Sequence, residues 1–422
     1  MKTAILGAGI AGLAYANELE KEGTTVFEKN SFYGGLCHSF EVGGFRFDSA
    51  VHLSFTNDDQ VREVFDKTPY LKHLPLACNF YGGYWLKHPA VNNLYQLEPE
   101  EKVRLLTSFV NRNEQAEVRN YKDWLLASYG EEISRKFYEV YTRKYWTIEA
   151  EKLSTTWIGK RLGTPDIEKM LWGAFSSETG IDYYAKEMRY PVKGGYQAFI
   201  NRLAENVDVV PNKEVVSVDL EKRELGFRDG TSCCYEKLAS SIPLPKLVEV
   251  TKNVTADVKN AAEKLIASKI SLVSVGFNKA DIPKNMWFYI YDEDIMAARV
   301  NSPSMKSADN APKNCSSLQF EIYHAPDAVI DPNAVVENTK YALRKMQLCE
   351  PEDILFMDYR QLDYGNVIFR NGMEKEREIV RRYYEEQGVD LIGRFGEWEY
   401  YWSDQSYMSG KTKGMKRKGE LG

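Results

Sequence analysis

The sequence predicts an α/β fold that begins with a strand, a glycine-rich turn and a helix. A second short strand follows the helix, so the opening is a βα unit of the kind that starts a doubly wound parallel sheet. Alternating strand patterns joined by an Asp-Gly turn return at residues 207–243. Together these observations predict a nucleotide-binding domain accompanied by further helical and mixed segments.

The opening unit has the spacing G-x-G-x-x-G. Residues 3–6 (TAIL) are expected to form a buried strand, and the helical pattern after the turn ends at Gly23. Gly7 permits the tight turn, Gly9 lets the backbone approach a pyrophosphate, and Gly12 lets the helix pack on the strand. The motif therefore predicts a dinucleotide site at the start of the helix.

The second strand, TTVFEKN, ends in Glu28, 16 residues after Gly12. A carboxylate at this place can accept hydrogen bonds from ribose hydroxyls. The same opening run, a lysine followed by small apolar residues, also fits a secretory signal peptide. The pattern continues to Glu28 without a small-residue cleavage site, so the sequence favours the nucleotide site.

Length and composition exclude several other classes of protein. With 422 residues and 43% hydrophobic residues, the chain can bury the cores of two or three domains. A net charge of −6 gives no overall attraction to nucleic acid or to anionic membranes. The six cysteines lack the spacing of a zinc site, and no apolar run is long enough to span a bilayer. We expect no metal, no membrane span and a cytoplasmic location.

A second glycine pair follows the second strand, in NSFYGGLCHSF, and leads to a hairpin that ends in Asp48. This combination resembles the FAD-binding start of the flavoprotein group that holds amine oxidases, protoporphyrinogen oxidase, phytoene desaturase and UDP-galactopyranose mutase. The resemblance implies a Rossmann-like FAD-binding domain with Gly34, Gly35 and Ser39 as cofactor contacts. The alternative is a glycine pair that only forms a surface turn.

The C-terminal stretch DLIGRFGEWEYYWSDQSYMSG contains a possible helix start. Asp404, Gln405 and Ser406 offer capping side chains and free backbone N–H groups there. In the flavoprotein group, the corresponding helix points its positive end at the flavin. The resemblance also implies cofactor contacts by Arg394 and by the backbone of Val215.

Four further stretches fall in the order and spacing of UDP-galactopyranose mutase, and they are more similar to its eukaryotic form. They are FYEVYTRKYWTIEAEKLSTTWIGKRLG, MRYPVKGGYQAF, MWFYIYDEDIMAARVNSP and IGRFGEWEYYWSDQS. The resemblance implies that Arg161 and Arg299 hold the substrate pyrophosphate, because two guanidinium groups can each donate paired, charge-assisted hydrogen bonds. Either arginine taken alone could instead be a solvated surface charge.

The same resemblance assigns roles to four other residues. Tyr289 and Tyr400 match tyrosines that contact the phosphates and line the pocket, and Trp146 matches a tryptophan beside the sugar. His52 matches the histidine beside the flavin. Trp146 could also be an ordinary core residue, and His52 a satisfied histidine at the end of a strand.

The sequence departs from the mutase pattern around the base and the sugar. Ala50 and Val51 replace two glycines before the histidine, and we expect Val51 to crowd that loop. The positions that would contact uracil, the sugar or a phosphate hold different residues here: His88, Val91, Thr142, Ala185 and Asn366. The pyrophosphate contacts therefore match better than the base and sugar contacts do.

Three domains are expected. The FAD-binding domain would combine residues 1–60, 190–250 and 386–422, since the flavoprotein group builds this domain from separated segments. Residues 61–189 would form a helical domain, and residues 251–385 a domain of mixed sheet and helix. The basic tail after Gly410 is interrupted by glycines, so we expect it to make a poor helix and to be disordered.

Three functions are consistent with the sequence. The first is a mutase-like flavoenzyme that isomerises the ring of a nucleoside-diphosphate sugar through reduced flavin, as in cell-surface polysaccharide synthesis, with NADPH or another external reductant. The second is an FAD-dependent oxidoreductase of the amine oxidase or protoporphyrinogen oxidase type, which takes hydride from a small substrate. The third is a flavin- or nucleotide-binding protein without catalysis. The oligomeric state is left open, and no nucleic acid partner is expected.

Overall fold

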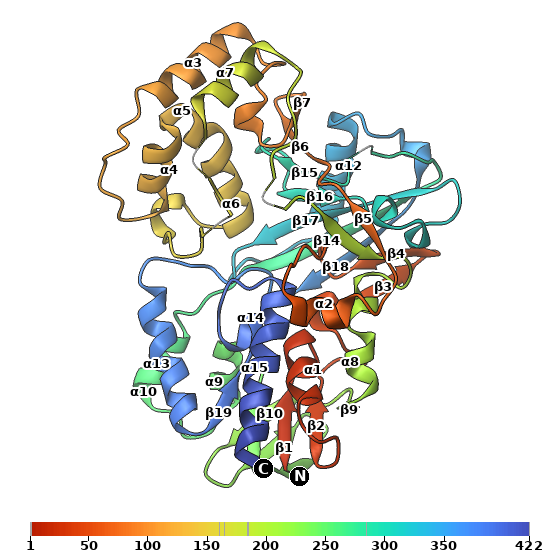
Figure 1. The fold of residues 1–422 in the computed structure, drawn as a ribbon, viewed down its shortest axis with the longest axis vertical. Coiled ribbons are helices and arrows are strands. Elements are labelled where there is room, and N and C mark those ends of the chain that lie inside the picture. Colours follow the sequence, from red (N-terminus) through yellow and green to blue (C-terminus); the bar gives the residue numbers. More distant parts are fainter. Residues whose placement is uncertain (1, 160, 164, 184, 284, 422) are drawn as a thin grey trace.

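The computed structural model describes residues 2–421 except residues 160, 164, 184 and 284. Three regions follow one another along the long axis of the molecule (Figure 1). A region built on a parallel sheet carries both termini, a mixed sheet lies in the middle, and a lobe of helices lies at the other end.

A parallel five-stranded sheet of order β19-β13-β1-β2-β9 organises the first region. All four residues of β1 are buried, as expected for a central strand with helices on its faces. The strands come from three distant parts of the chain, so the predicted α/β fold class with a discontinuous Rossmann-like sheet is confirmed. They are β1 (Thr3–Leu6), β2 (Thr24–Phe27), β9 (Asp208–Val210), β13 (Lys237–Ser240) and β19 (Val389–Leu391).

Helices lie around the parallel sheet, and two small antiparallel sheets lie beside it or between it and the middle region (Figure 1). The helices are α1 (Ile10–Asn17), α2 (Asp59–Phe65), α8 (Asn201–Glu205), α9 (Leu244–Val250), α10 (Ala256–Ala262), α13 (Met373–Glu386), α14 (Gly393–Gly396) and α15 (Ser403–Leu421). Two antiparallel sheets accompany them: β3 (Ser39–Val42) with β4 (Phe45–Asp48), and β10 (Val215–Asp219), β11 (Glu224–Phe227) and β12 (Ser232–Cys234).

The middle region is a seven-stranded sheet of order β18-β14-β17-β16-β15-β6-β7, antiparallel except where β15 meets β6. Its strands are β6 (Ala77–Tyr81), β7 (Tyr84–Lys87), β14 (Lys269–Phe277), β15 (Trp287–Ile290), β16 (Arg299–Asn301), β17 (Ser316–His324) and β18 (Ile354–Leu362), with α11 (Pro303–Lys306) and α12 (Pro332–Lys345) beside them. The two-stranded sheet of β5 (Tyr70–His73) and β8 (Met188–Pro191) lies nearby. Residues 70–87, which the sequence predicts to be part of the helical domain, thus supply strands.

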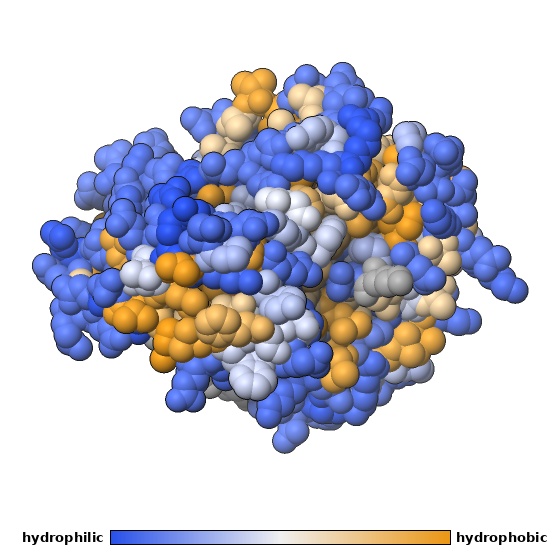
Figure 2. Space-filling model, turned by 90° about the horizontal axis from the view of Figure 1, so that it is seen from above, coloured by the Kyte–Doolittle hydropathy of each residue, from blue (hydrophilic) through white to orange (hydrophobic). Residues whose placement is uncertain are grey.

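The helical lobe contains α3 (Pro99–Val110), α4 (Tyr121–Tyr129), α5 (Glu131–Ile133), α6 (Val140–Trp146) and α7 (Ile167–Phe175). A π-helical turn, Ser134–Glu139, joins α5 to α6. This lobe faces the viewer in Figure 2, where hydrophobic side chains form separate patches on a mostly hydrophilic surface. In the part of the chain that the structure describes, no helix is both long and apolar enough to span a bilayer.

The prediction of a disordered tail after Gly410 is wrong. Residues 403–421 form α15, which lies beside α1 along its length (Figure 1). A Cβ atom at Gly410 would come within 2.1 Å of the Ala11 carbonyl oxygen, and one at Gly414 within 2.7 Å of the Tyr15 carbonyl oxygen. The glycines that weaken the intrinsic helix propensity are therefore the residues that let the two helices approach, and the packing outweighs the propensity.

We expect Gly410→Ala to lower the free energy of unfolding by about 1–3 kcal/mol, because the added methyl group forces the two helices apart. Urea unfolding followed by circular dichroism measures this change.

Gly419→Ala is the matched control, since Gly419 lies in the same helix and a Cβ atom there meets nothing within 4 Å. This variant should be as stable as the unmodified chain or slightly more stable. Equal stability of both variants would contradict the tight packing of α1 against α15.

Candidate functional site

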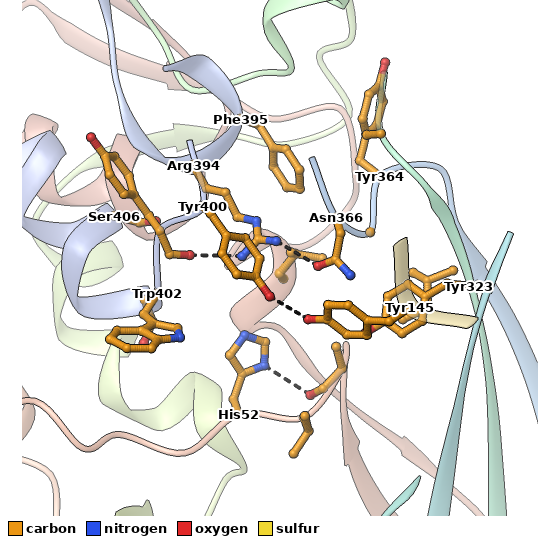
Figure 3. Close-up of a pocket in the computed structure, with 18 of the residues that line it drawn as sticks. His52, Tyr145, Tyr323, Tyr364, Asn366, Arg394, Phe395, Tyr400, Trp402 and Ser406 are labelled. Atoms are coloured by element: carbon orange, nitrogen blue, oxygen red, sulfur yellow. Dashed lines mark hydrogen bonds between the residues drawn. The ribbon is translucent and has the colours of Figure 1, made fainter. Parts of the chain in front are cut away.

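A single cavity of about 1570 Å³ runs from the carboxyl ends of β1 and β2 into the helical lobe. The glycine-rich turn lies at one end, and residues of α6 and of the loop before α7 lie at the other. Figure 3 shows part of its wall, where aromatic rings, Arg394, Asn366 and His52 surround one space. The cavity is therefore large enough for a dinucleotide together with a second ligand.

The first glycine motif has the geometry expected from its sequence. Gly7 has φ +94°, and a Cβ atom at Gly12 would come within 2.0 Å of the Gly7 carbonyl oxygen. A Cβ atom at Gly9, by contrast, meets no protein atom within 4 Å, and Gly9 lines the cavity. Gly9 begins α1 without a side-chain cap. The space over Gly9 therefore fits a pyrophosphate at the helix N-terminus.

Glu28 ends β2 at the wall of the cavity, and it is 6% exposed. One carboxylate oxygen accepts a hydrogen bond from Ala8 N at 3.0 Å, and the other accepts from Asn30 N at 2.9 Å. These bonds fix the carboxylate beside the glycine turn. Its remaining lone pairs suit the ribose hydroxyls of a dinucleotide.

The second glycine pair packs on the first motif rather than forming a separate surface turn. Gly34 N donates to the Ala8 carbonyl oxygen at 2.8 Å, and a Cβ atom at Gly35 would lie 3.3 Å from Gly9 Cα. Both glycines have positive φ and line the cavity. Ser39 is not among the residues that line the cavity, and its hydroxyl donates to Asp48 Oδ1 at 2.7 Å.

The start of α15 also reaches the cavity, since Asp404 and Ser406 line it. Gln405 does not line it, because its side chain turns back and accepts a hydrogen bond from Trp402 N at 2.9 Å. Val215 and Arg394 contribute to the wall as well. Together with the two glycine motifs and Glu28, these groups fit an extended dinucleotide such as FAD.

The loop before His52 adopts a glycine-like conformation without glycine. Ala50 has φ +117°, a region that residues with a Cβ atom rarely enter. Val51 N donates to Glu321 Oε1 at 2.7 Å, which holds the loop in place. His52 Nδ1 lies 3.1 Å from the Ala50 carbonyl oxygen, so it donates, and burial lowers the pKa of His52. The imidazole is therefore neutral near pH 7 and keeps Nε2 as an acceptor.

Arg161 and Arg394 both lie over the ring of Tyr400. Their Cζ atoms are 4.4 and 4.8 Å from the ring centroid. Arg161 also donates to the Tyr400 carbonyl oxygen at 2.6 Å, and Arg394 donates to the Tyr401 carbonyl oxygen at 3.0 Å. Two guanidinium groups thus meet at one aromatic ring in the cavity wall.

Arg299 lies in the same cavity but is paired with a carboxylate. Its Nε and Nη2 donate to Glu321 Oε2 at 2.8 and 2.5 Å, across the β16–β17 register in which the two residues are partners. Burial lowers the pKa of Arg299, whereas the negative charge of Glu321 raises it. The second effect is larger in sum with the neighbouring tyrosines, so the pKa of Arg299 lies well above its ordinary value. Much of the charge expected to hold a pyrophosphate is therefore neutralised within the protein.

Aromatic side chains form the wall between these arginines. Tyr145 and Tyr400 share a hydrogen bond of 2.8 Å between their hydroxyls (Figure 3), and Trp146 packs 5.1 Å from the Tyr400 ring. Tyr289 lies 5.5 Å from the ring of Tyr141. All of these residues line the cavity. The predicted residues Trp146 and Tyr400 are thus in contact, and Tyr289 lines the same cavity beside Tyr141.

His88 and Val91 also line the cavity, at its helical end. Burial lowers the pKa of His88 to about 4. The Asn79 amide nitrogen donates to the carbonyl oxygens of Leu86 and Lys87, so Asn79 Oδ1, 3.3 Å from His88 Nδ1, is an acceptor. His88 Nδ1 therefore carries the proton, and Nε2 is left as an acceptor.

Of the predicted contact positions Ala185 and Asn366, only one lines the cavity. Ala185 is buried in a small cluster with Trp287 and does not line the cavity, whereas Asn366 does.

Sequence reasoning missed Glu321 and Tyr145. A glutamate within the otherwise apolar strand SLQFEIYHA is a signal that could have found Glu321. Tyr138, Tyr141 and Tyr145 recur at helical spacing directly before Trp146, which could have found the aromatic wall.

Comparison with protein families gives a match at the N-terminus. Residues 5–68 match the model of the NAD(P)-binding Rossmann-like domain. A 1-hydroxycarotenoid 3,4-desaturase from Flavobacterium sp. (strain P99-3) is 40% identical over 89 residues, which are 19% of this chain and 18% of the desaturase. The chain thus matches less than a fifth of the length of that relative.

Comparison with solved structures gives a match along the whole chain. The crystal structure of reduced UDP-galactopyranose mutase superposes with a TM-score of 0.91 at 22% identity, over 100% of this chain and 96% of the mutase chain. The two proteins share a fold.

An uncharacterized protein in the nifH2 3′ region of Methanothermococcus thermolithotrophicus is 36% identical over 92 residues, which are 21% of this chain and 84% of that protein. The chain belongs to the same family as that protein, and its N-terminal segment is a Rossmann-like domain of the NAD(P)-binding type.

Proposed function

We propose that this chain is an FAD-dependent enzyme that isomerises the sugar ring of a nucleoside-diphosphate sugar, as a UDP-galactopyranose mutase does. The observation that carries the proposal is that one cavity joins the two glycine motifs to Arg161 and to a wall of tyrosines. A dinucleotide on the glycine motifs would leave the arginine end open for an anionic substrate. The shared fold with reduced UDP-galactopyranose mutase supports the same proposal.

The cofactor would be held by the first helix, Glu28 and the start of α15. Bound FAD, once reduced, would supply the nucleophile for the anomeric carbon of the sugar. The reaction has no net redox change, so an external donor such as NADPH would be needed only to bring the flavin into its reduced form.

The residues of the chain would hold the leaving diphosphate and exclude water. Arg161 can donate to phosphoryl oxygens, and its stacking on Tyr400 and Trp402 fixes the plane of the guanidinium group. The Tyr145 and Tyr400 hydroxyls can donate or accept beside it. His52, neutral near pH 7, can accept a proton or a hydrogen bond from a sugar hydroxyl.

An FAD-dependent oxidoreductase is the second candidate, and one observation favours it. Glu321 neutralises Arg299, one of the two arginines predicted to hold the diphosphate, and many aromatic side chains line the cavity around it. Such a cavity suits an uncharged substrate that gives hydride to the flavin. The N-terminal identity with a carotenoid desaturase is compatible with this alternative.

Turnover by the reduced protein tests the proposal. After anaerobic reduction of the flavin-loaded protein with dithionite, we expect UDP-galactopyranose or another nucleotide sugar to give an isomerised sugar, detected by chromatography. The oxidised protein is the control and should give no product. Absence of product from every nucleotide sugar, together with bleaching of the flavin by an amine or a polyene, would favour the oxidoreductase.

Arg161→Lys should lower kcat/KM by roughly tenfold to a hundredfold, because lysine cannot donate two parallel hydrogen bonds to a phosphate. Steady-state kinetics of the reduced protein measure the loss. Arg382→Lys is the matched control: Arg382 is exposed, is paired with Glu378, and neither residue lines the cavity. Equal values of kcat/KM for the two variants would show that Arg161 does not contact the substrate.

Gly9→Ala tests the cofactor site without disturbing the protein core. The new methyl group contacts no protein atom within 4 Å, and Gly9 has φ −73°, which alanine adopts readily. It would instead occupy the space assigned to the pyrophosphate. We expect at least a tenfold loss of bound flavin, measured from the visible absorbance of the purified protein, with little change in thermal stability of the apoprotein.

Gly180→Ala is the control for this substitution. Gly180 is exposed, does not line the cavity, and its added Cβ atom also meets nothing within 4 Å. Full flavin content in both variants would place the dinucleotide elsewhere.

A further inference from the structure

An aromatic row leads from the cavity to the surface of the helical lobe. Its members, from the cavity outward, are Tyr400, Trp146, Trp157, Tyr121 and Trp124. Successive ring centroids are 5.1, 4.8, 5.0 and 5.8 Å apart, so each ring contacts the next. The first four rings line the cavity, whereas Trp124 does not line it and is partly exposed on α4, at the outer side of the lobe (Figure 1). Contacting rings therefore join the cavity to the solvent.

All five members of the aromatic row carry an indole or a phenol, the aromatic groups of proteins that give up an electron most readily. A second row of rings shows the difference, and its members are Tyr145, Tyr141, Tyr291, Phe137 and Tyr81. Phe137 lies 5.1 Å from the ring of Tyr291 and 4.9 Å from that of Tyr81. The benzene ring of phenylalanine is much harder to oxidise. The second row is therefore interrupted for electron transfer, and the aromatic row is continuous.

The indole of Trp157 is not explained by a hydrogen bond. The residue is 8% exposed, and its N–H group has no partner among the described residues. An unpaired buried donor destabilises the fold, and phenylalanine at this position would avoid that cost. The cost favours a role for the indole ring itself. Because an indole can give up an electron and keep its N–H proton, Trp157 can pass electrons without a proton acceptor beside it.

We propose that the aromatic row carries electrons from a donor at Trp124 to flavin bound in the cavity when that flavin is excited by light. The ring nearest the flavin gives it one electron, since excited oxidised flavin is a strong one-electron oxidant. The electron deficit then moves outward to Trp124, where a thiol in solution replaces the electron.

The electrons and protons of this reaction balance over two such events. Two thiol groups lose two electrons and two protons and join in a disulfide, and the flavin takes up two electrons and two protons. The donor does not need to enter the cavity. The proposal requires bound FAD and does not involve isomerisation of a sugar.

Blue light and dithiothreitol test the aromatic row under anaerobic conditions. The oxidised, flavin-loaded protein is illuminated, and the visible absorbance of the flavin follows its reduction; a sample kept in the dark gives the rate without light. Trp124→Phe and Trp157→Phe each replace one indole by a ring that resists oxidation, while an aromatic ring stays in place. Thermal unfolding and the content of bound flavin show that each variant is folded and loaded.

Trp85→Phe and Tyr81→Phe are the matched controls. Trp85 is also partly exposed, but its ring packs against two phenylalanines and lies outside the aromatic row. Tyr81 ends the second row, beyond Phe137. Both controls should therefore be reduced as fast as the unmodified protein.

We expect Trp124→Phe and Trp157→Phe to slow the light-driven reduction about tenfold. If Trp157→Phe loses its flavin, Trp124→Phe carries the test, because Trp124 does not line the cavity. Equal rates in all four variants would overturn the proposal, since the electron would then reach the flavin without the aromatic row. Absence of light-driven reduction in the unmodified protein would overturn it as well.

No nucleotide sugar is present in these measurements. Their failure would leave the proposed function standing, and a lack of sugar isomerisation by the reduced protein would leave the aromatic row standing.

Discussion

The buried carboxylate of Glu321 holds together two parts of the cavity wall, namely Arg299 on the seven-stranded sheet and the loop that carries His52. Glu321 is 0% exposed, and a charge so deeply buried is tolerated only when it is paired and hydrogen-bonded. Arg299 and the Tyr323 hydroxyl bind one oxygen, and Val51 N binds the other. The seven-stranded sheet is thereby tied to the loop that carries His52. The alanine at position 50 keeps its unfavourable positive φ within this restrained loop.

This pairing also explains how charge is distributed along the cavity. Glu321 neutralises Arg299, while Arg161 and Arg394 gather at the ring of Tyr400. A diphosphate would therefore find its strongest electrostatic partners on the side of the cavity formed by Tyr400 and its neighbours. The tyrosines and tryptophans of α6 and the following loop line this side of the cavity, and their low polarity strengthens each hydrogen bond made beside them.

The parts that could be predicted from the sequence are those fixed by local geometry. The strand, the glycine turn and the helix at residues 3–17 follow from spacing alone, because Gly7 and Gly12 are required by a turn and a close contact within one unit. The start of α15 could be predicted from its capping residues, but its continuation after Gly410 could not, because the glycines there act through packing on α1. A glutamate in an apolar strand marks Glu321 in the sequence, but only the β16–β17 register shows that its partner is Arg299. Residues 70–87 form strands through pairing with distant segments, which the sequence does not show.

The central claim is that flavin and an anionic substrate share one cavity. Titration of the oxidised, flavin-loaded protein with UDP-galactopyranose, followed through the visible absorbance of the flavin, tests it most directly. The account predicts a saturable shift of the flavin spectrum whose midpoint equals the dissociation constant measured by calorimetry. Binding detected by calorimetry with an unchanged flavin spectrum would place the nucleotide sugar outside this cavity and contradict the account.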